Sequence, residues 1–194
     1  MTVTVLLVRH AAHVDLDGRL SGRRVDVALS DIGRAQAAAL GQALAGRGID
    51  RVECSPLDRT RDTAAAIARV CALPPPLPVE ALVEIDMGDW TGRALDGFGD
   101  DPAWRDWNER RASARIPGGE TMAEAQARIV GHLRTLHEGT VALVTHSDMI
   151  RAAVAHVLGL SLDNLLRFDI DPASVTTVVM GDWGARLLSL NVRH

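Results

Sequence analysis

The chain has 194 residues, which suits one domain with a hydrophobic core of ordinary size. Hydrophobic residues make up 47% and charged residues 24%, as in globular proteins, and no apolar run approaches the roughly 18 residues of a membrane span. The net charge of −4 gives no support for nucleic-acid binding, which would need a basic face, and no membrane is expected as a partner because no apolar run is long enough to span one.

Two further features of composition bear on chemistry and location. All 21 Lys or Arg positions are Arg, so any cation that binds an anion must be Arg or a protonated His. Cys54 and Cys71 have neither CxxC nor zinc-ligand spacing and are expected to be free core thiols in a reducing cytoplasm. The N-terminus lacks the basic segment and cleavage site of a signal peptide, which also favours a cytoplasmic location.

The first apolar run, residues 3–8, predicts a strand that is buried on both faces of a parallel sheet. It stops abruptly on Arg9 and His10. Sheets of this kind bind ligands in the crevice outside the carboxyl ends of their strands. Arg9 and His10 are therefore candidates for a binding site, although a surface Arg-His pair after a core strand has the same sequence pattern.

The rest of the chain alternates between helices and strands, which indicates an α/β sandwich. Ser30 is expected to cap the first helix, Pro56 to open the second and Ser147 to cap the last. Apolar positions such as Ile32 are expected to form the buried face of the first helix. The predicted elements in chain order are a polar loop to about Gly22, a helix over 31–47, a strand over 51–54, a helix over 55–71, a helix over 120–137, a strand over 140–146, a helix over 147–158, and strands over 174–180 and 186–190.

Residues 86–118 interrupt this alternation. They contain Gly, Asp and the tryptophans Trp90, Trp104 and Trp107, with a short helix expected near 102–112. The segment lacks an apolar set of its own. It is therefore expected to be a lid-like excursion within a single domain of residues 1–194, with its tryptophans packed in the core or in the lid.

Two predicted strands end in histidine, His10 and His146, and their carboxyl ends should lie on one side of the sheet. Metal ligation, a nucleophile with its helper, and coincidence all fit this pattern. No third ligand stands beside either histidine at metal-site spacing, so no metal is expected. Arg9 adjoins His10, and Arg59 falls in the first turn of a predicted helix. A helix N-terminus with a guanidinium group suits a phosphoryl group.

Five short segments follow one another in a recognisable order. They are Leu7–Ala11 (strand-RH(G/A)), Ser55–Ala64 (SxLxRxxxTA), Leu82–Gly92 (LxEIxxGxWxG), Pro117–Thr121 (PGGE(S/T)) and Val144–Ser147 (a strand ending in (S/T)H). Each is weak alone, but together they resemble the signatures of the histidine phosphatase superfamily, in its phosphoglycerate-mutase-like branch. The resemblance implies a three-layer α/β/α sandwich with a mostly parallel central sheet.

In that family a histidine is phosphorylated and then hydrolysed. The resemblance implies that His10 is the nucleophile, that Arg9, Arg59 and His146 surround the phosphoryl group, and that Glu84 is the proton donor. The chemistry agrees, because a neutral imidazole attacks phosphorus and cations hold the negative transition state. In this arrangement His146 would serve best as an imidazolium.

Further positions are implied with less detail. Ser21 and Gly22 match the small residue and glycine that touch substrate in relatives, and the Ser147 N–H, at a helix start, can add a donor. The loop 11–23 departs from the common form of the family, since Ala-Ala-His stands where Gly-Glu-Thr is frequent. Five histidines have no partner that the sequence identifies and are expected to be surface or local: His13, His132, His137, His156 and His194.

The sequence therefore predicts a metal-independent phosphomonoesterase without a cofactor, which hydrolyses a small phosphorylated metabolite through a phosphohistidine. One alternative is a phosphoglycerate mutase, although the short segment 86–118 favours hydrolysis. Another is a non-catalytic phospho-ligand binding module on the same fold, against which the complete set of five catalytic side chains argues. A homodimer through an edge strand is compatible with the sequence, which does not identify the substrate.

Overall fold

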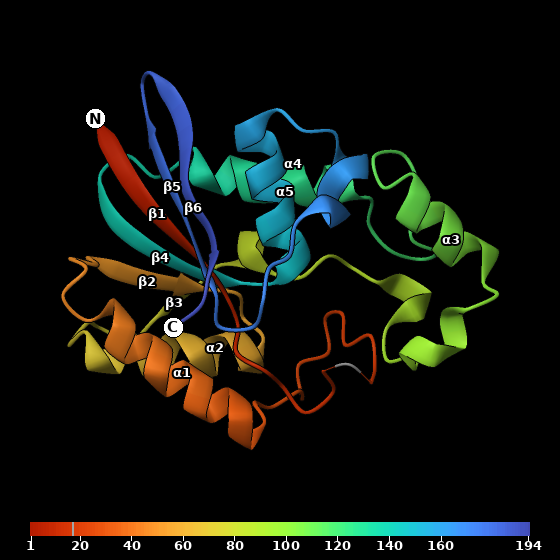
Figure 1. Ribbon diagram of the computed structural model, residues 1–194, viewed down its shortest axis with the longest axis horizontal. Helices are drawn as coiled ribbons and strands as arrows, with labels where there is room; N and C mark the ends of the chain where they lie inside the picture. The colour runs from red at the N-terminus through yellow and green to blue at the C-terminus, as the bar shows by residue number, and fades with distance from the viewer. Residues whose placement is uncertain (17) are drawn as a thin grey trace.

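A six-stranded sheet organises the computed structural model, which describes residues 1–16 and 18–194 (Figure 1). The strands are β1 (Thr2–Arg9), β2 (Arg51–Cys54), β3 (Leu77–Pro78), β4 (Gly139–Thr145), β5 (Val175–Gly181) and β6 (Gly184–Val192). They lie in the order β3-β2-β4-β1-β5-β6, and of these β5 alone runs against the others. The predicted α/β class with a mostly parallel sheet is confirmed.

Helices cover both faces of this sheet. The α-helices are α1 (Asp31–Leu44), α2 (Asp58–Val70), α3 (Pro102–Glu109), α4 (Met122–Leu133) and α5 (Ser147–Leu158). The short 3-10 helices are η1 (Glu80–Leu82), η2 (Gly88–Trp90), η3 (Leu95–Phe98) and η4 (Leu162–Arg167). Figure 1 shows α1 and α2 on one face and α4 and α5 on the other, which gives three layers. None of the helices in the described part of the chain is long and apolar enough to span a membrane.

The two faces of β1 belong to two different cores. Val5 and Leu7 pack in the cluster that contains α4 and α5, whereas Leu6 and Val8 pack in the cluster that contains α1 and α2. Successive side chains of a strand point to opposite faces, so a strand covered on both sides needs apolar residues at every position. The continuous run at residues 3–8 follows from this burial.

Helix α1 is capped as predicted but buries a different face. The Ser30 hydroxyl accepts a hydrogen bond from the Gly33 N–H at 3.1 Å. Ile32 is 69% exposed, so the expected face is wrong. A Cβ at Gly33 would lie 1.8 Å from the Ala12 carbonyl oxygen. At Gly33 the helix therefore packs through its backbone against Ala12, a contact that the pattern of apolar side chains does not predict.

Two helix starts also differ from the prediction. Helix α2 has Leu57 at its N-cap, so Pro56 precedes the helix and does not open it. Helix α5 begins at Ser147 itself, with His146 at the N-cap in an extended conformation (φ −120°, ψ 162°). Here β4 passes directly into α5, so His146, the last extended residue, takes the N-cap position that Ser147 was expected to occupy.

The segment 86–118 extends away from the sheet and carries α3, drawn in green in Figure 1. Its aromatic side chains form one cluster, in which the Trp90 ring centroid lies 5.2 to 5.9 Å from those of Phe98, Trp104 and Trp107. Trp90 and Trp107 are buried and continue the core on the α4–α5 side of the sheet. The expected packing role of the tryptophans is confirmed.

Candidate active site

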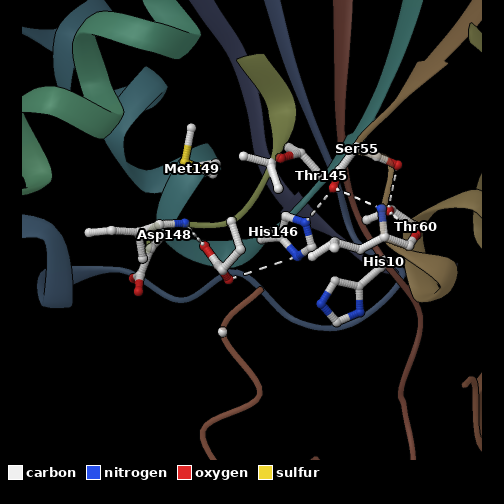
Figure 2. Close-up of polar contacts among 12 residues, drawn as sticks. His10, Ser55, Thr60, Thr145, His146, Asp148 and Met149 are labelled. Atoms are coloured by element: carbon white, nitrogen blue, oxygen red, sulfur yellow. Dashed lines mark hydrogen bonds and ion pairs between the residues drawn. The ribbon is translucent and has the colours of Figure 1, made fainter. Parts of the chain in front are cut away.

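The carboxyl ends of β1 and β4 bring His10 and His146 together. The two strands pair in parallel with Arg9 opposite Thr145, so the residues that follow lie side by side. The His10 and His146 ring centroids are 5.2 Å apart, and the two side chains face one another in Figure 2. Both residues are buried. Burial of two adjacent imidazoles at strand ends makes their protonation states depend on the groups around them.

The orientation of the His10 ring defines which nitrogen is reactive. Nδ1 lies 2.8 Å from the Ala11 carbonyl oxygen, which can only accept, so Nδ1 carries the proton of the neutral ring. Burial, and then the charges of Arg59 and Arg9, lower the pKa of His10 well below its usual value. The ring is therefore neutral at physiological pH, and its Nε2 has the free lone pair that a nucleophile needs.

Arg59 is held in place by the first loop. It is 2% exposed, and it donates from Nη2 to the Gly22 carbonyl at 2.6 Å and from Nη1 to the Arg24 carbonyl at 3.1 Å. Nη2 also lies 3.5 Å from His146 Nδ1. These anchors fix the guanidinium group beside the two histidines, where its charge acts on both.

Arg9 is fixed by the segment that precedes β5. Its Nη1 donates to the Ile170 carbonyl at 2.6 Å, in the chain that leads into β5. Its buried Nε has no hydrogen-bond partner among the described residues. The charge of Arg9 lowers the pKa of both His10 and His146. Arg9 and Arg59 thus place two cations around the paired imidazoles.

His146 is held at both ring nitrogens. Nε2 lies 2.9 Å from the Ser55 hydroxyl oxygen (Figure 2), and Nδ1 lies 3.8 Å from Glu84 Oε2. Burial, and then the charge of Arg59, lower the pKa of His146 well below its usual value. The ring is neutral here, whereas the sequence predicted an imidazolium. Burial beside two guanidinium groups favours the uncharged form.

Glu84 lies beside His146, and its surroundings raise its pKa toward neutrality. Its Oε1 accepts a hydrogen bond from the Ile85 N–H at 2.9 Å. Burial, and then the charge of Asp148, raise the pKa of Glu84 to about 7, although the charge of Arg59 lowers it. A carboxyl group with this pKa can give up a proton and take one back at neutral pH, as a general acid–base catalyst must.

A polar network fixes the backbone that carries Glu84. Arg23 Nε donates to the Glu84 carbonyl oxygen at 2.8 Å, and its Nη2 donates to Glu120 Oε2 at 2.8 Å. The same Glu120 oxygen accepts from Arg128 Nη2 at 3.0 Å and from the Asp86 N–H at 2.9 Å. Glu120, the glutamate of the PGGE segment, therefore helps to fix the backbone position of Glu84, the proton-donor candidate.

Ser21, Gly22 and Ser147 occupy three different environments. Ser21 is 6% exposed, and its hydroxyl has no hydrogen-bond partner among the described residues, so it is available to a ligand. Gly22 has φ +50°, and its carbonyl oxygen accepts from Arg59, so it acts on the site through that arginine. Ser147 is the first residue of α5, whose N–H belongs to the helix-start amides that have no intrahelical acceptor.

Sequence reasoning missed three residues of this site. His13 is 8% exposed with its ring centroid 5.2 Å from that of His10, whereas it was expected at the surface. Asp148 is equally buried and accepts from Arg111 at 3.2 Å. The position of Asp148, two residues after a strand-end histidine, was a usable signal. Arg111 belongs to the segment 86–118 and had no local signal.

The buried and partly buried groups of the site form one chemical arrangement. An unprotonated imidazole nitrogen, two fixed guanidinium groups and a carboxyl group with a pKa of about 7 meet at the ends of two strands. Guanidinium groups bind phosphoryl oxygens, and the imidazole and the carboxyl group supply a nucleophile and a proton. The arrangement can hold a phosphoryl group, accept it and protonate its leaving group.

Comparisons with known proteins agree with this arrangement. The model of the histidine phosphatase superfamily (branch 1) matches residues 5–193. The chain is 32% identical to phosphoserine phosphatase 1 of Hydrogenobacter thermophilus, over 98% of this chain and 92% of that protein. It is 33% identical to a probable phosphoglycerate mutase of Erwinia tasmaniensis, over 90% and 83%. A solved mycobacterial glucosyl-3-phosphoglycerate phosphatase superposes with a TM-score of 0.85 at 27% identity, over 99% and 100%.

The chain belongs to the histidine phosphatase superfamily, branch 1. The five ordered signatures predicted this membership, and its phosphoglycerate-mutase-like relatives confirm the predicted branch.

Proposed function

We propose that the protein is a phosphomonoesterase that hydrolyses a small phosphorylated metabolite through a phosphohistidine on His10. The observation that carries this proposal is the His10 ring, whose Nδ1–H donates to the Ala11 carbonyl and leaves Nε2 unprotonated, while the charges of Arg59 and Arg9 keep the ring neutral. Relatives named phosphoserine phosphatase and glucosyl-3-phosphoglycerate phosphatase support hydrolysis of a small phosphoester.

In the first step, His10 Nε2 attacks phosphorus in line with the ester oxygen. The N–P bond forms, the P–O bond breaks, and Glu84 gives its proton to the departing oxygen. Arg9 and Arg59 hold the equatorial oxygens, whose negative charge also favours a proton on His146. His146 is then the imidazolium that the sequence predicted, once an anion lies beside it.

In the second step, the Glu84 carboxylate takes a proton from water as the water oxygen attacks phosphorus. The N–P bond breaks, inorganic phosphate forms, and His10 returns to its neutral state with Glu84 protonated. The raised pKa of Glu84 suits both directions of proton transfer. Ser21 and the Ser147 N–H supply further donors to the phosphoryl oxygens or to the substrate.

A second candidate function is phosphoglycerate mutase activity, which the relative of that name at 33% identity favours. In that reaction the phosphoryl group returns to another hydroxyl of the substrate and does not pass to water. The product separates the two functions, since a mutase interconverts 2- and 3-phosphoglycerate and a phosphatase releases inorganic phosphate. A non-catalytic binding module would do neither.

Three further expectations belong to this proposal. Positive charge at the site comes from arginines, which supports metal-independent chemistry. Cys54 and Cys71 are both free, in line with the expected cytoplasmic location. The segment 86–118 is proposed to act as the lid-like part of a single domain, since its aromatic cluster continues the core and its Arg111 reaches Asp148.

Phosphate release from p-nitrophenyl phosphate in the presence of EDTA tests the proposal. The wild type should release phosphate with EDTA present, and His10→Ala should fall to background. His137→Ala, a change at an exposed histidine, is the matched control and should behave as the wild type. Equal release by His10→Ala would remove His10 as the nucleophile. Interconversion of 2- and 3-phosphoglycerate without net phosphate release would favour the mutase.

A further inference from the structure

Asp148 is a buried charged residue that the proposed reaction leaves without a role. It lies in the first turn of α5, two residues after His146, and is 8% exposed. Its Oδ1 forms ion pairs with Arg111 Nη1 at 3.2 Å and with Arg151 Nη1 at 3.3 Å. In Figure 2 it lies on the other side of His146 from His10. An acidic residue is thus fixed in a site that binds an anion.

Charged and titratable groups on five parts of the fold act on the Glu84 side chain, while Arg23 and Arg128 donate to its main-chain carbonyl oxygen. Each of the five groups has an electrostatic interaction or a close contact with the Glu84 side chain: Arg9 at the end of β1, Arg59 on α2, Arg111 after α3, His146 at the end of β4 and Asp148 on α5. The arginines favour loss of the Glu84 proton, and His146, which is neutral in the free enzyme whose pKa values govern kcat/KM, has little effect there. Asp148 is the member of this set whose charge favours keeping the proton.

The two ion pairs fix the Asp148 carboxylate within this set of charges. Arg111 and Arg151 both donate to the same oxygen of Asp148, so their charges are offset where they would otherwise add to those of Arg9 and Arg59. Because Asp148 is buried and the Glu84 side chain is only 12% exposed, water screens the interaction between the two carboxyl groups weakly. The negative charge of Asp148 therefore offsets part of the positive charge that the arginines place around Glu84.

We propose that Asp148 is a positioning residue of the reaction, whose carboxylate, fixed by Arg111 and Arg151, keeps Glu84 in its acid form for protonation of the leaving group. The inference rests on the proposed function, in which Glu84 is the proton donor. It assigns the buried ion-pair cluster of Asp148, Arg111 and Arg151 to catalysis and not to stability alone.

The pH profile of Asp148→Asn tests this role. With an alkyl phosphate, which needs a protonated leaving group, the descending limb of kcat/KM should move to lower pH by about one unit. The ratio of activity at pH 8 to activity at pH 5 should then be about tenfold lower in Asp148→Asn than in the wild type. With p-nitrophenyl phosphate, whose leaving group needs little protonation, the change should be smaller. A uniform loss at every pH and with both esters would indicate a merely structural role and overturn the proposal.

Three variants serve as controls. Asp148→Glu keeps the charge and should keep the limb near its original pH. Asp163→Asn makes the same change at an exposed carboxylate that accepts from the Ala112 N–H at 2.8 Å, beside Arg111, and should not move the limb. Arg111→Gln removes a cation and should move the limb to higher pH. A shift of the same sign in Asp148→Asn and Arg111→Gln would contradict an electrostatic effect.

A direct titration of Glu84 separates this inference from the proposed function. Carbon-13 NMR of the Glu84 carboxyl group reports its pKa whether or not the protein turns over an ester. A lower pKa in Asp148→Asn supports the effect of Asp148, and an unchanged pKa overturns it. If Glu84 shifts as expected but no ester is hydrolysed, the proposed function fails and the electrostatic coupling stands.

Discussion

His10 and Glu84 illustrate how one physical cause produces two useful protonation states. Burial disfavours the charged form of any side chain, so it lowers the pKa of the imidazole and raises that of the carboxyl group. The result is a neutral base beside a carboxyl group that is still partly protonated near pH 7. A phosphohistidine mechanism needs this combination, because the nucleophile must have a lone pair and the donor must have a proton.

Glu84→Gln tests the acid role. Gln is close in size to Glu but has no proton to give, so kcat with an alkyl phosphate should fall about 10²–10⁴-fold. In the wild type, activity should decline as pH rises through about 7, where Glu84 loses its proton. A pH–rate profile measures both effects. Persistence of the same descending limb in Glu84→Gln would mean that another group is the proton donor.

At the scale of elements, Gly33 marks where α1 meets the loop after the nucleophile. Gly33→Ala should destabilise the protein by about 1–3 kcal/mol, because the new Cβ would lie 1.8 Å from the Ala12 carbonyl oxygen. This oxygen belongs to the main chain, so it cannot move aside as a flexible side chain would. Activity should fall as well, since Ala12 follows the residue that orients His10. Urea unfolding and phosphate release measure the two effects.

Gly131→Ala in α4 is the matched control for this change. Nothing lies within 4 Å of the position of a Cβ at Gly131, so the substitution should stabilise the helix by about 0.5–1 kcal/mol. If Gly33→Ala were as stable as Gly131→Ala, the close packing of α1 on the Ala12 backbone would be wrong.

Some elements of the fold were predictable from the sequence and others were not. The strands β1 and β4 were predictable because burial on both faces leaves continuous apolar runs, and their parallel pairing then placed His10 beside His146. The buried face of α1 was not predictable, since its contact runs through glycine. The protonation of His146 was not predictable either, because it depends on how deeply the ring and its arginines are buried.

Ion pairs between residues far apart in the sequence were not predictable, because they depend on the tertiary fold and not on local sequence spacing. Arg111 and Asp148 are separated by 37 positions, and Arg111 stacks on the Trp107 ring at 3.8 Å from its centroid. The ion pair joins segments that no local spacing relates, whereas Trp107 and Arg111 are four positions apart, which is the spacing of neighbours on a helix. Glu53 and His132, which meet at 2.6 Å between β2 and α4, are a second example, and His132 had been expected to be local.

At the scale of the whole molecule, the two edges of the sheet differ in length. Strand β3 has two residues and includes Pro78, whereas β6 has nine and carries Leu188 at 56% exposure. The homodimer through an edge strand stays a prediction, and β6 is the edge that suits it. A charge on an edge strand discourages pairing with another chain.

Sedimentation equilibrium tests this prediction. The wild type should have the mass of a dimer, and Leu188→Lys should shift it toward the monomer. Leu166→Lys, at a similarly exposed leucine of η4, should leave the dimer intact. A wild-type protein that stays monomeric at every concentration would contradict the prediction.

The central claim is that the phosphoryl group passes through His10. The most direct measurement locates that group by peptide mass spectrometry in protein quenched with alkali during turnover, since phosphohistidine survives alkali. The account predicts one phosphoryl group on His10 in the wild type and none in His10→Ala, which also has no turnover. A phosphoryl group on another residue, or turnover by His10→Ala, would contradict it.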